Sequence, residues 1–253
     1  MAPNPGKLVT KFILAAAVAA SLLTSASAQA NIRSVTFYTV KPDRLSDFQA
    51  HIKEYQALLA KGGSVGYSTV WLSLTGPRTW ALARYYKTWA ELDAGPEAAM
   101  KEQATELAQI NTRIGDCIES SRRTIEEVDP GLSLPDSGSV PKMLRVLVTQ
   151  VRPDKFADYL ALAKSDILPA VKKSGAKDFT MAQGRYGEPS ATMTSVLGFN
   201  SWAELDEGLG AEKGLGKDGY AALLMKTRPL VVSSEYDVYR YQPELSYLPA
   251  ATK

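Results

Sequence analysis

Apolar residues follow two kinds of spacing along the chain, and segments with these spacings occur in the same order in both halves. Alternation of apolar and polar residues predicts a β-strand, whereas apolar residues spaced three and four apart predict one face of a helix. In the first half these patterns predict strand, helix, strand, strand, helix and strand at residues 31–40, 45–59, 67–74, 80–86, 97–117 and 121–128. In the second half they predict the same succession at residues 142–151, 156–171, 179–183, 191–199, 220–226 and 231–241.

A short motif marks the same point in each half. Thr88-Trp89-Ala90-Glu91-Leu92-Asp93 returns 113 residues later as Ser201-Trp202-Ala203-Glu204-Leu205-Asp206. A Ser or Thr followed three residues later by Glu is a capping box, in which both side chains satisfy free backbone N–H groups at a helix start. The motif therefore predicts a helix start after the third strand of each half. We also expect Trp89 and Trp202 to anchor these helices on the sheets, each contributing about 3 kcal/mol or more.

A β-α-β-β-α-β half with a capped Trp-Ala-Glu-Leu segment after its third strand resembles the unit of the dimeric α+β barrel superfamily, which includes antibiotic-biosynthesis-monooxygenase-like and NIPSNAP-like proteins. In that superfamily two units put their sheets face to face. This chain holds both units, so the resemblance implies an α+β fold of two tandem ferredoxin-like repeats, with antiparallel sheets packed as an intramolecular α+β barrel. The superfamily includes cofactor-free oxygenases, haem enzymes, isomerases and decarboxylases, so the fold does not specify a function.

The repeat also sets the domain boundaries. We expect the first ferredoxin-like repeat at residues 31–131, a linker rich in Pro, Gly, Ser and Asp at 132–141, and the second repeat at 142–247. Each predicted sheet carries helices on one face, and its twin would cover the other face. The alternation of residues along the strands does not show which side of each sheet faces the helices. It also does not show whether the space between the sheets is packed or open.

The first residues have the pattern of an export signal. Lys7 and Lys11 precede an uncharged apolar run from Phe12 to Leu23, and Ala26-Ser27-Ala28 ends it with small residues. We therefore predict a signal peptide at residues 1–28 and a mature protein in the periplasm or outside the cell. Removing the two lysines leaves basic residues equal in number to the 27 acidic ones, so the charge does not indicate nucleic-acid binding. No later stretch is apolar and long enough for membrane insertion after cleavage.

Aromatic and arginine side chains concentrate on the predicted strands. They could form a pocket in which aromatic rings hold a flat or apolar ligand while an arginine binds an anion, or they could pack the core and rim. The candidate ligand-binding residues are Tyr38, Trp71, Trp80, Arg84, Tyr86, Arg145 and Arg185. Arg145 is the strongest candidate, because it interrupts the apolar segment 143–148, where a cation is costly unless it is paired or faces an open space.

No residue pattern identifies a catalytic centre. His51 is the only histidine and lies in a predicted helix, aligned with Leu162 of the second half, which favours a structural or surface role. Cys117 is the only cysteine, which excludes an internal disulfide and indicates a small buried apolar residue. We therefore predict no metal site and no cofactor. A carboxylate pair could transfer protons or could face outward, and the carboxylates on the final strands are Glu126, Glu127, Glu235 and Asp237.

Three functions stay open at this point. The leading hypothesis is an exported protein that binds a small organic ligand between or beside its two sheets. The first alternative is a cofactor-independent oxygenase-like enzyme, as the resemblance implies, and the second is a non-catalytic scaffold with a packed centre. A binding protein needs a cavity with convergent polar groups, an enzyme also needs a titrating group near the ligand, and a scaffold predicts no cavity above about 300 Å³. The sequence gives neither the ligand nor the oligomeric state.

Cleavage of the leader can be tested by intact-mass analysis of protein secreted from a bacterial host. We expect the mature chain to begin at Gln29 or Asn31, since Ala26-Ser27-Ala28 and Ala28-Gln29-Ala30 are two frames with small residues at the required positions. Ala28→Glu damages both frames and should leave the leader attached, whereas Gln29→Glu should be cleaved normally. An exported wild-type chain that still contains Lys7 and Lys11 would contradict the signal peptide.

Overall fold

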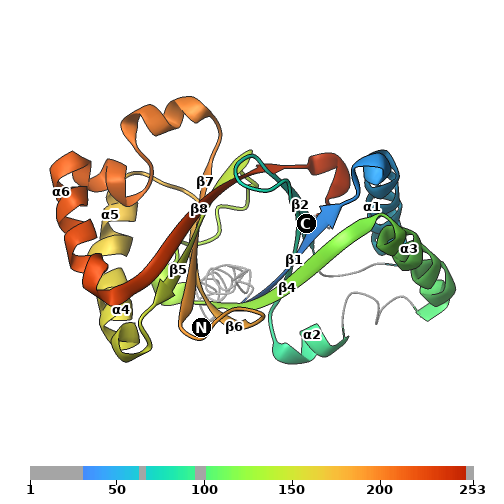
Figure 1. Cartoon of the computed structure of the whole chain (residues 1–253), viewed down its shortest axis with the longest axis horizontal. Coiled ribbons are helices and arrows are strands. Elements are labelled where there is room, and N and C mark those ends of the chain that lie inside the picture. Colours follow the sequence, from blue (N-terminus) through green and yellow to red (C-terminus); the bar gives the residue numbers. More distant parts are fainter. Residues whose placement is uncertain (1–30, 63–66, 95–100, 249–253) are drawn as a thin grey trace, which may run out of the picture.

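The computed structural model describes residues 31–62, 67–94 and 101–248. Among these residues eight antiparallel strands form one closed barrel in the order β1-β3-β2-β8-β5-β7-β6-β4 (Figure 1). The strands are β1 Ile32–Val40, β2 Ser68–Ser73, β3 Trp80–Tyr86, β4 Ile118–Val128, β5 Met143–Val151, β6 Phe179–Tyr186, β7 Thr192–Phe199 and β8 Val231–Tyr241.

Each half of the chain supplies four neighbouring strands of this barrel, which confirms the predicted pair of ferredoxin-like units. The two sheets meet along two seams, β2 with β8 and β4 with β6. At the first seam Trp71 pairs with Tyr241, and at the second Val128 pairs with Ala182. The sheets therefore do more than face each other, because backbone hydrogen bonds join their edges and close the barrel.

Helices cover the outside of the barrel in two groups (Figure 1). Helices α1, Leu45–Lys61, and α3, Ala104–Asp116, lie against the first half. Helices α4, Phe156–Leu162, α5, Leu168–Lys173, and α6, Ala211–Thr227, lie against the second half. Each group buries its own hydrophobic cluster against the outer wall of the barrel, so the two cores lie outside the ring of strands.

The structure resolves which face of each strand meets the helices. On β1, Tyr38 and Val40 pack against the helical core of the first half, with the ring of Tyr38 5.8 Å from that of Phe48. Val35 and Phe37, one step out of phase, point to the barrel interior. Both faces of β1 are therefore largely covered, one by helices and the other by the opposite wall.

The second half departs from the predicted helix pattern in two places. The helix predicted at 156–171 is interrupted by a π-helical segment, Ala163–Ile167, just before Pro169. Proline lacks an N–H and clashes with the carbonyl four residues earlier, and a π-turn accommodates that defect. Helix α6 approaches α5 so closely at Gly214 that a Cβ there would lie 1.9 Å from the carbonyl oxygen of Ala170. This contact explains the glycine at position 214.

Other boundaries shift by a few residues. Strand β4 begins at Ile118, three residues before the predicted start, and β6 continues to Tyr186. Helix α3 begins at Ala104, and residues 97–100 of the predicted helix lie outside the described residues.

Both capping motifs bind free backbone N–H groups, but in the first one Glu91 reaches the N–H of Lys87 and not that of the cap residue Thr88. In the first, the N–H of Glu91 donates to Thr88 Oγ1 at 3.2 Å and that of Lys87 donates to Glu91 Oε2 at 2.6 Å. In the second, Glu204 Oε1 accepts from the N–H of Ser201 at 3.1 Å. The first motif opens the short helix α2, Trp89–Ala94, and the second opens a 3₁₀ segment, Trp202–Glu207, in place of an α-helix.

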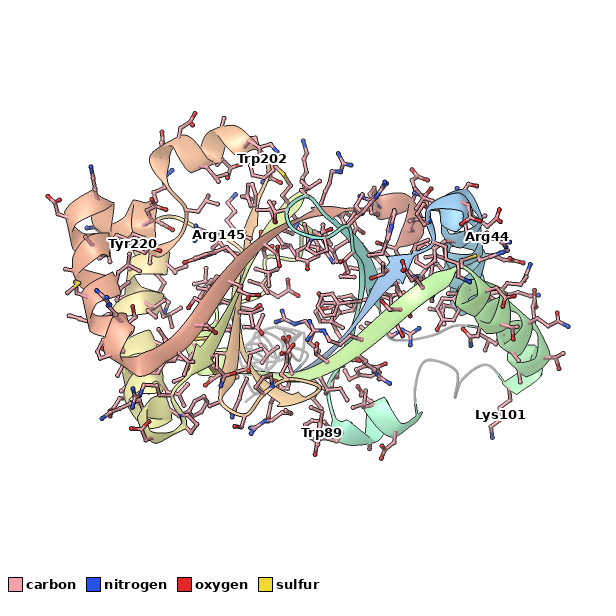
Figure 2. The ribbon with its side chains drawn as sticks, viewed as in Figure 1. Arg44, Trp89, Lys101, Arg145, Trp202 and Tyr220 are labelled. Atoms are coloured by element: carbon pink, nitrogen blue, oxygen red, sulfur yellow. The ribbon has the colours of Figure 1, made fainter. Side chains whose placement is uncertain are left out.

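The predicted anchoring role of the two motif tryptophans is wrong. Trp89 is 41% exposed and Trp202 is 50% exposed, and Figure 2 shows both at the periphery. Each makes an edge contact with one ring, Trp89 with Tyr186 at 5.9 Å and Trp202 with Phe199 at 6.0 Å. The segments they open are too short to carry these side chains over the sheet.

Truncation of three tryptophans tests this revised assignment. We expect Trp89→Ala and Trp202→Ala each to lower the free energy of unfolding by about 1 kcal/mol or less, since half-exposed side chains release little apolar surface. Trp80→Ala should cost about 3 kcal/mol or more, because Trp80 is only 2% exposed and packs on Phe48. Urea denaturation of the three variants measures this, and equal losses for Trp80 and Trp89 would contradict it.

Candidate functional site

A cavity of about 1050 Å³ lies inside the barrel, and residues from all eight strands line it. An eight-stranded barrel is usually just wide enough for its own side chains to fill it. Here small residues point inward in the middle of the wall, including Ala81, Ala83, Val146, Val196 and Gly198. The choice of small inward residues therefore leaves the centre open.

The middle of the cavity wall is apolar and aromatic. Val35 and Phe37 of β1 face it, together with Trp71 of β2 and Val146 of β5. The indole N–H of Trp71 donates to Thr69 Oγ1 at 2.8 Å, so this buried side chain presents its ring to the cavity without an unsatisfied donor.

A buried ion pair stands at one end of the cavity. Arg33 on β1 and Glu126 on β4 are cross-strand partners, and both Nε and Nη2 of Arg33 lie 2.7 Å from Glu126 Oε2. Their side chains are 7% and 6% exposed. Burial has the largest single effect and lowers the pKa of Arg33, but the charge and hydrogen bond of Glu126 together with the neighbouring Tyr85 and Tyr67 outweigh it, so the pKa is raised. Arg33 therefore remains a cation, held in place also by a hydrogen bond to Thr180.

Two stacked tyrosines stand beside this ion pair. The rings of Tyr67 and Tyr85 lie 4.3 Å apart and nearly parallel, at 15°. Burial, the neighbouring Tyr85 and the charge of Asp136 raise the pKa of Tyr67. Its phenol therefore keeps its proton and can donate a hydrogen bond to a bound molecule.

The other end of the cavity is more open and carries further charges. Arg122 lies 4.8 Å above the ring of Phe37 and pairs with Glu188 at 2.7 Å. Glu235, Asp237 and Tyr239 line the same region from β8. Burial, followed by the charge of Asp237, raises the pKa of Tyr239 to about 12.

Of the seven candidate ligand-binding residues, Trp71 lines the cavity and the others do not. Tyr38, Trp80, Arg84 and Tyr86 lie on the outer faces of β1 and β3, where Arg84 donates to the hydroxyl of Tyr55 at 2.5 Å. Arg185 pairs with Glu127 at 2.6 Å, outside the cavity. The prediction grouped both faces of these strands together, because alternation separates two faces without showing which is inside.

Arg145 lies on the outer face of β5 and does not line the cavity. Its Nη2 donates to the carbonyl of Leu209 at 3.2 Å, and its guanidinium lies 5.5 Å from the ring of Tyr236. A second oxygen ligand is more distant, since Glu212 Oε2 is 4.0 Å from Nη1. Figure 2 shows Arg145 on the side of the sheet that faces α5 and α6. These contacts, and not a ligand, compensate the cation.

Several charged and aromatic residues of the cavity were not among the candidates predicted from the sequence. These are Arg33, Tyr67, Tyr85, Arg122 and Glu188. Three of the four carboxylates considered for proton transfer, Glu126, Glu235 and Asp237, do face the cavity. An alignment of the two repeats could have identified the ion pair. It matches Arg33 with Leu144 and Glu126 with Tyr239, so the two charged residues occur in one repeat only.

The cavity does not fit a haem held through histidine or cysteine, which would need such a side chain to face the group. His51 lies on α1 with Nδ1 3.6 Å from Glu54 Oε2, away from the cavity wall. Cys117 is buried as predicted, and its thiol donates to the carbonyl of Arg113 at 3.3 Å. Within residues 31–62, 67–94 and 101–248 there is no group of three or more His, Cys, Asp or Glu side chains arranged to hold a metal ion.

No protein-family model matches the sequence, and no curated protein resembles it significantly. Solved structures do match over most of their length. A candidate monooxygenase of Fusobacterium nucleatum subsp. nucleatum superposes with a TM-score of 0.62 at 11% identity, over 84% of this chain and 93% of that one. An anthrone oxidase-like protein gives 0.53 at 14% identity, over 84% and 92% of the chains. A chlorite dismutase of Candidatus Nitrospira defluvii gives 0.52 at 9% identity, over 86% and 92%.

The chain has the dimeric α+β barrel fold, with both units in one polypeptide. At these identities the likeness concerns the fold alone, and the α+β barrel supports several chemistries. None of the described helices of this α+β barrel protein is both long and apolar enough to cross a bilayer. The function must therefore be argued from the cavity.

The raised pKa of Tyr239 predicts a loss of stability in alkaline solution. An unfolded tyrosine ionises near its model value of 10.0, whereas Tyr239 in the fold holds its proton to about 12. The stability that this phenol contributes is thus present below pH 10 and is lost as the pH rises toward 12. We expect urea denaturation between pH 9 and 12 to show a smaller alkaline decline for Tyr239→Phe than for the wild type. Tyr186→Phe, at a position that is 63% exposed and outside the cavity lining, serves as the control.

Proposed function

We propose that this protein binds a small organic ligand inside its barrel and acts as an exported binding protein. The observation that carries the proposal is the cavity of about 1050 Å³, with an apolar middle and polar groups at both ends. Cavities that take small ligands commonly measure about 300 to 1,000 Å³ and combine an apolar wall with a few placed polar groups. A scaffold with a packed centre would lack such a space.

The apolar wall is the main source of affinity in this proposal. Val35, Phe37, Trp71 and Val146 offer a surface on which a ligand can bury its hydrocarbon part. Burying about 200 Å² of apolar ligand surface would contribute about 5 kcal/mol before the entropy cost of association. The polar ends would then fix the orientation of the ligand.

The protonation states favour binding over proton-transfer catalysis. The pKa values of Arg33 and Tyr67 are raised, and that of Tyr239 is raised to about 12, so each shift moves the group away from neutral pH. A general acid or base works best with a pKa near the working pH. These three groups therefore serve better as fixed donors than as catalysts, which places the oxygenase-like alternative second.

Export is part of the proposal and is supported by the leader sequence, whose residues lie outside the described part of the chain. A binding protein without an internal disulfide needs a large core to remain folded there. The two helix-covered cores of this fold supply it.

Filling the cavity tests whether it binds ligands. The neutral fluorescent probe N-phenyl-1-naphthylamine should bind the wild-type protein saturably, and Val146→Trp should weaken this binding by about tenfold or more. The new indole would occupy the centre of the cavity, where the wall has room for it. Val232→Trp makes the same exchange at a position 66% exposed on β8 and should bind the probe like the wild type.

Equal affinities for the two tryptophan variants, or no saturable binding at all, would overturn the proposal. Thermal melts of both variants show whether the fold is retained. Native mass spectrometry of protein from the producing cells would then give the mass of a molecule that stays in the cavity.

A further inference from the structure

The cavity wall carries an excess of negative charge. Six of its lining residues are Asp or Glu and two are Arg. Arg33 compensates Glu126, and Arg122 compensates Glu188. The remaining four carboxylates, Asp136, Asp178, Glu235 and Asp237, have no Lys or Arg within salt-bridge distance among the described residues. A hollow with walls of one sign concentrates the electric field inside it and attracts the opposite charge.

The carboxylate of Glu126 lies in the cavity wall, and one of its oxygens is not contacted by Arg33. Both ionic contacts of Arg33 reach the same oxygen of Glu126, Oε2. No hydrogen bond from a described residue reaches the other oxygen, Oε1, although Glu126 is only 4% exposed and lines the cavity. Oε1 is open to the cavity, whereas Arg33 Nη2 is fully buried and makes no hydrogen bond of good geometry with a described residue. Glu126 Oε1 thus offers an acceptor to a molecule in the cavity.

The twin unit shows that the fold does not require this ion pair. Strands β1 and β5 have nine residues each, and β4 and β8 have eleven, so Arg33 corresponds to Leu144 and Glu126 to Tyr239. Leu144 and Tyr239 are cross-strand partners, as Arg33 and Glu126 are. A buried ion pair is often no more stabilising than an apolar pair of similar size. Retention of the charged pair in one unit therefore points to recognition.

Aromatic rings complete the surroundings of this acceptor. The stacked pair Tyr67 and Tyr85 lies beside Arg33, and burial keeps the phenol of Tyr67 neutral. The π-faces of such rings attract cations. Asp136 and Asp178 line the same end, so its net charge stays negative even though Arg33 neutralises Glu126.

We propose that the ligand of the barrel is an organic cation, an amine or protonated nitrogen heterocycle with an apolar body, whose N–H donates to Glu126 Oε1. The inference rests on the proposed function, and it specifies the charge of the ligand and the residue that binds the charged group. Glu126 is the recognition residue, and Arg33 is a positioning residue that holds Glu126 through its Oε2. The body of the ligand lies along Phe37, Trp71 and Val146.

Three probes that share a naphthalene body but differ in charge test this assignment. They are 1-naphthylmethylamine, 1-naphthalenemethanol and 1-naphthoic acid, which are cationic, neutral and anionic at pH 7. Isothermal titration of the full mature chain should show the amine binding at least tenfold tighter than the alcohol, and the acid weakest. The preference for the amine should shrink as salt is raised from 20 to 500 mM, since added ions screen the charges.

The double variant Arg33→Leu/Glu126→Tyr carries the pair that the second unit already accommodates. We expect its melting temperature to equal or exceed that of the wild type, while the tenfold preference for the amine over the alcohol disappears. Binding of the alcohol should change less than threefold. Glu127→Gln alters the neighbouring carboxylate, which pairs with Arg185 outside the cavity, and should keep the preference intact.

The outcomes separate the two proposals. If none of the three probes binds the wild type, the binding function itself fails. If the probes bind but the acid matches the amine, or if the double variant keeps the preference, the cavity is a binding site and the assignment to a cation is wrong. Should the double variant not fold, Glu126→Gln removes the charge with little change in shape and must abolish the preference for the amine.

Discussion

Closure of the barrel at its two seams is the constraint on which the rest of this structure depends. Each four-stranded unit has two edges with free N–H and C=O groups, and the seams β2–β8 and β4–β6 pair all four edges. The first seam is reinforced by the C-terminal segment, since the N–H of Tyr247 donates to the carbonyl of Ser68 at 2.9 Å and the reverse bond has the same length. Because an unpaired edge exposes backbone groups to other chains, each unit needs its twin.

Closure also gives the two faces of each strand different roles, since the outer face packs against helices and the inner face lines the cavity. The outer faces and the helices form two hydrophobic cores, with Phe48 and Trp80 in one and Phe199 and Met181 in the other. Those cores contain most of the buried hydrophobic side chains, so the inner face contributes only a smaller cluster around Trp71 and Tyr239. It can carry small side chains and leave space, as Ala81 and Ala83 do, or carry charges such as Arg33 and Glu126. The cavity follows from stability being placed outside the ring of strands.

The sequence allowed the topology to be predicted but not the site. Two repeats of one hydrophobic pattern, with matching capping motifs at Thr88 and Ser201, were enough to predict two ferredoxin-like units. The site could not be predicted because both faces of these strands carry apolar side chains. The alternation of residues therefore does not show which face points into the barrel. Arg145 looked like a cation facing an open space, yet a carbonyl and an aromatic ring on the helix side satisfy it. Capping motifs likewise specify a helix start and do not say whether the tryptophan that follows is buried.

Duplication within one chain gives this fold a freedom that a symmetric dimer lacks. In a dimer of identical units, a charged pair at Arg33 and Glu126 would occur twice, and the cavity would carry both copies. Here the second unit has Leu144 and Tyr239 at the corresponding positions, so the buried ion pair occurs only once in the cavity wall. A cavity with a single such pair can hold a ligand in one orientation, because the two halves of its wall are not equivalent. The desolvation of the ion pair then lowers the stability of the barrel only once, and the helix-covered cores compensate for it.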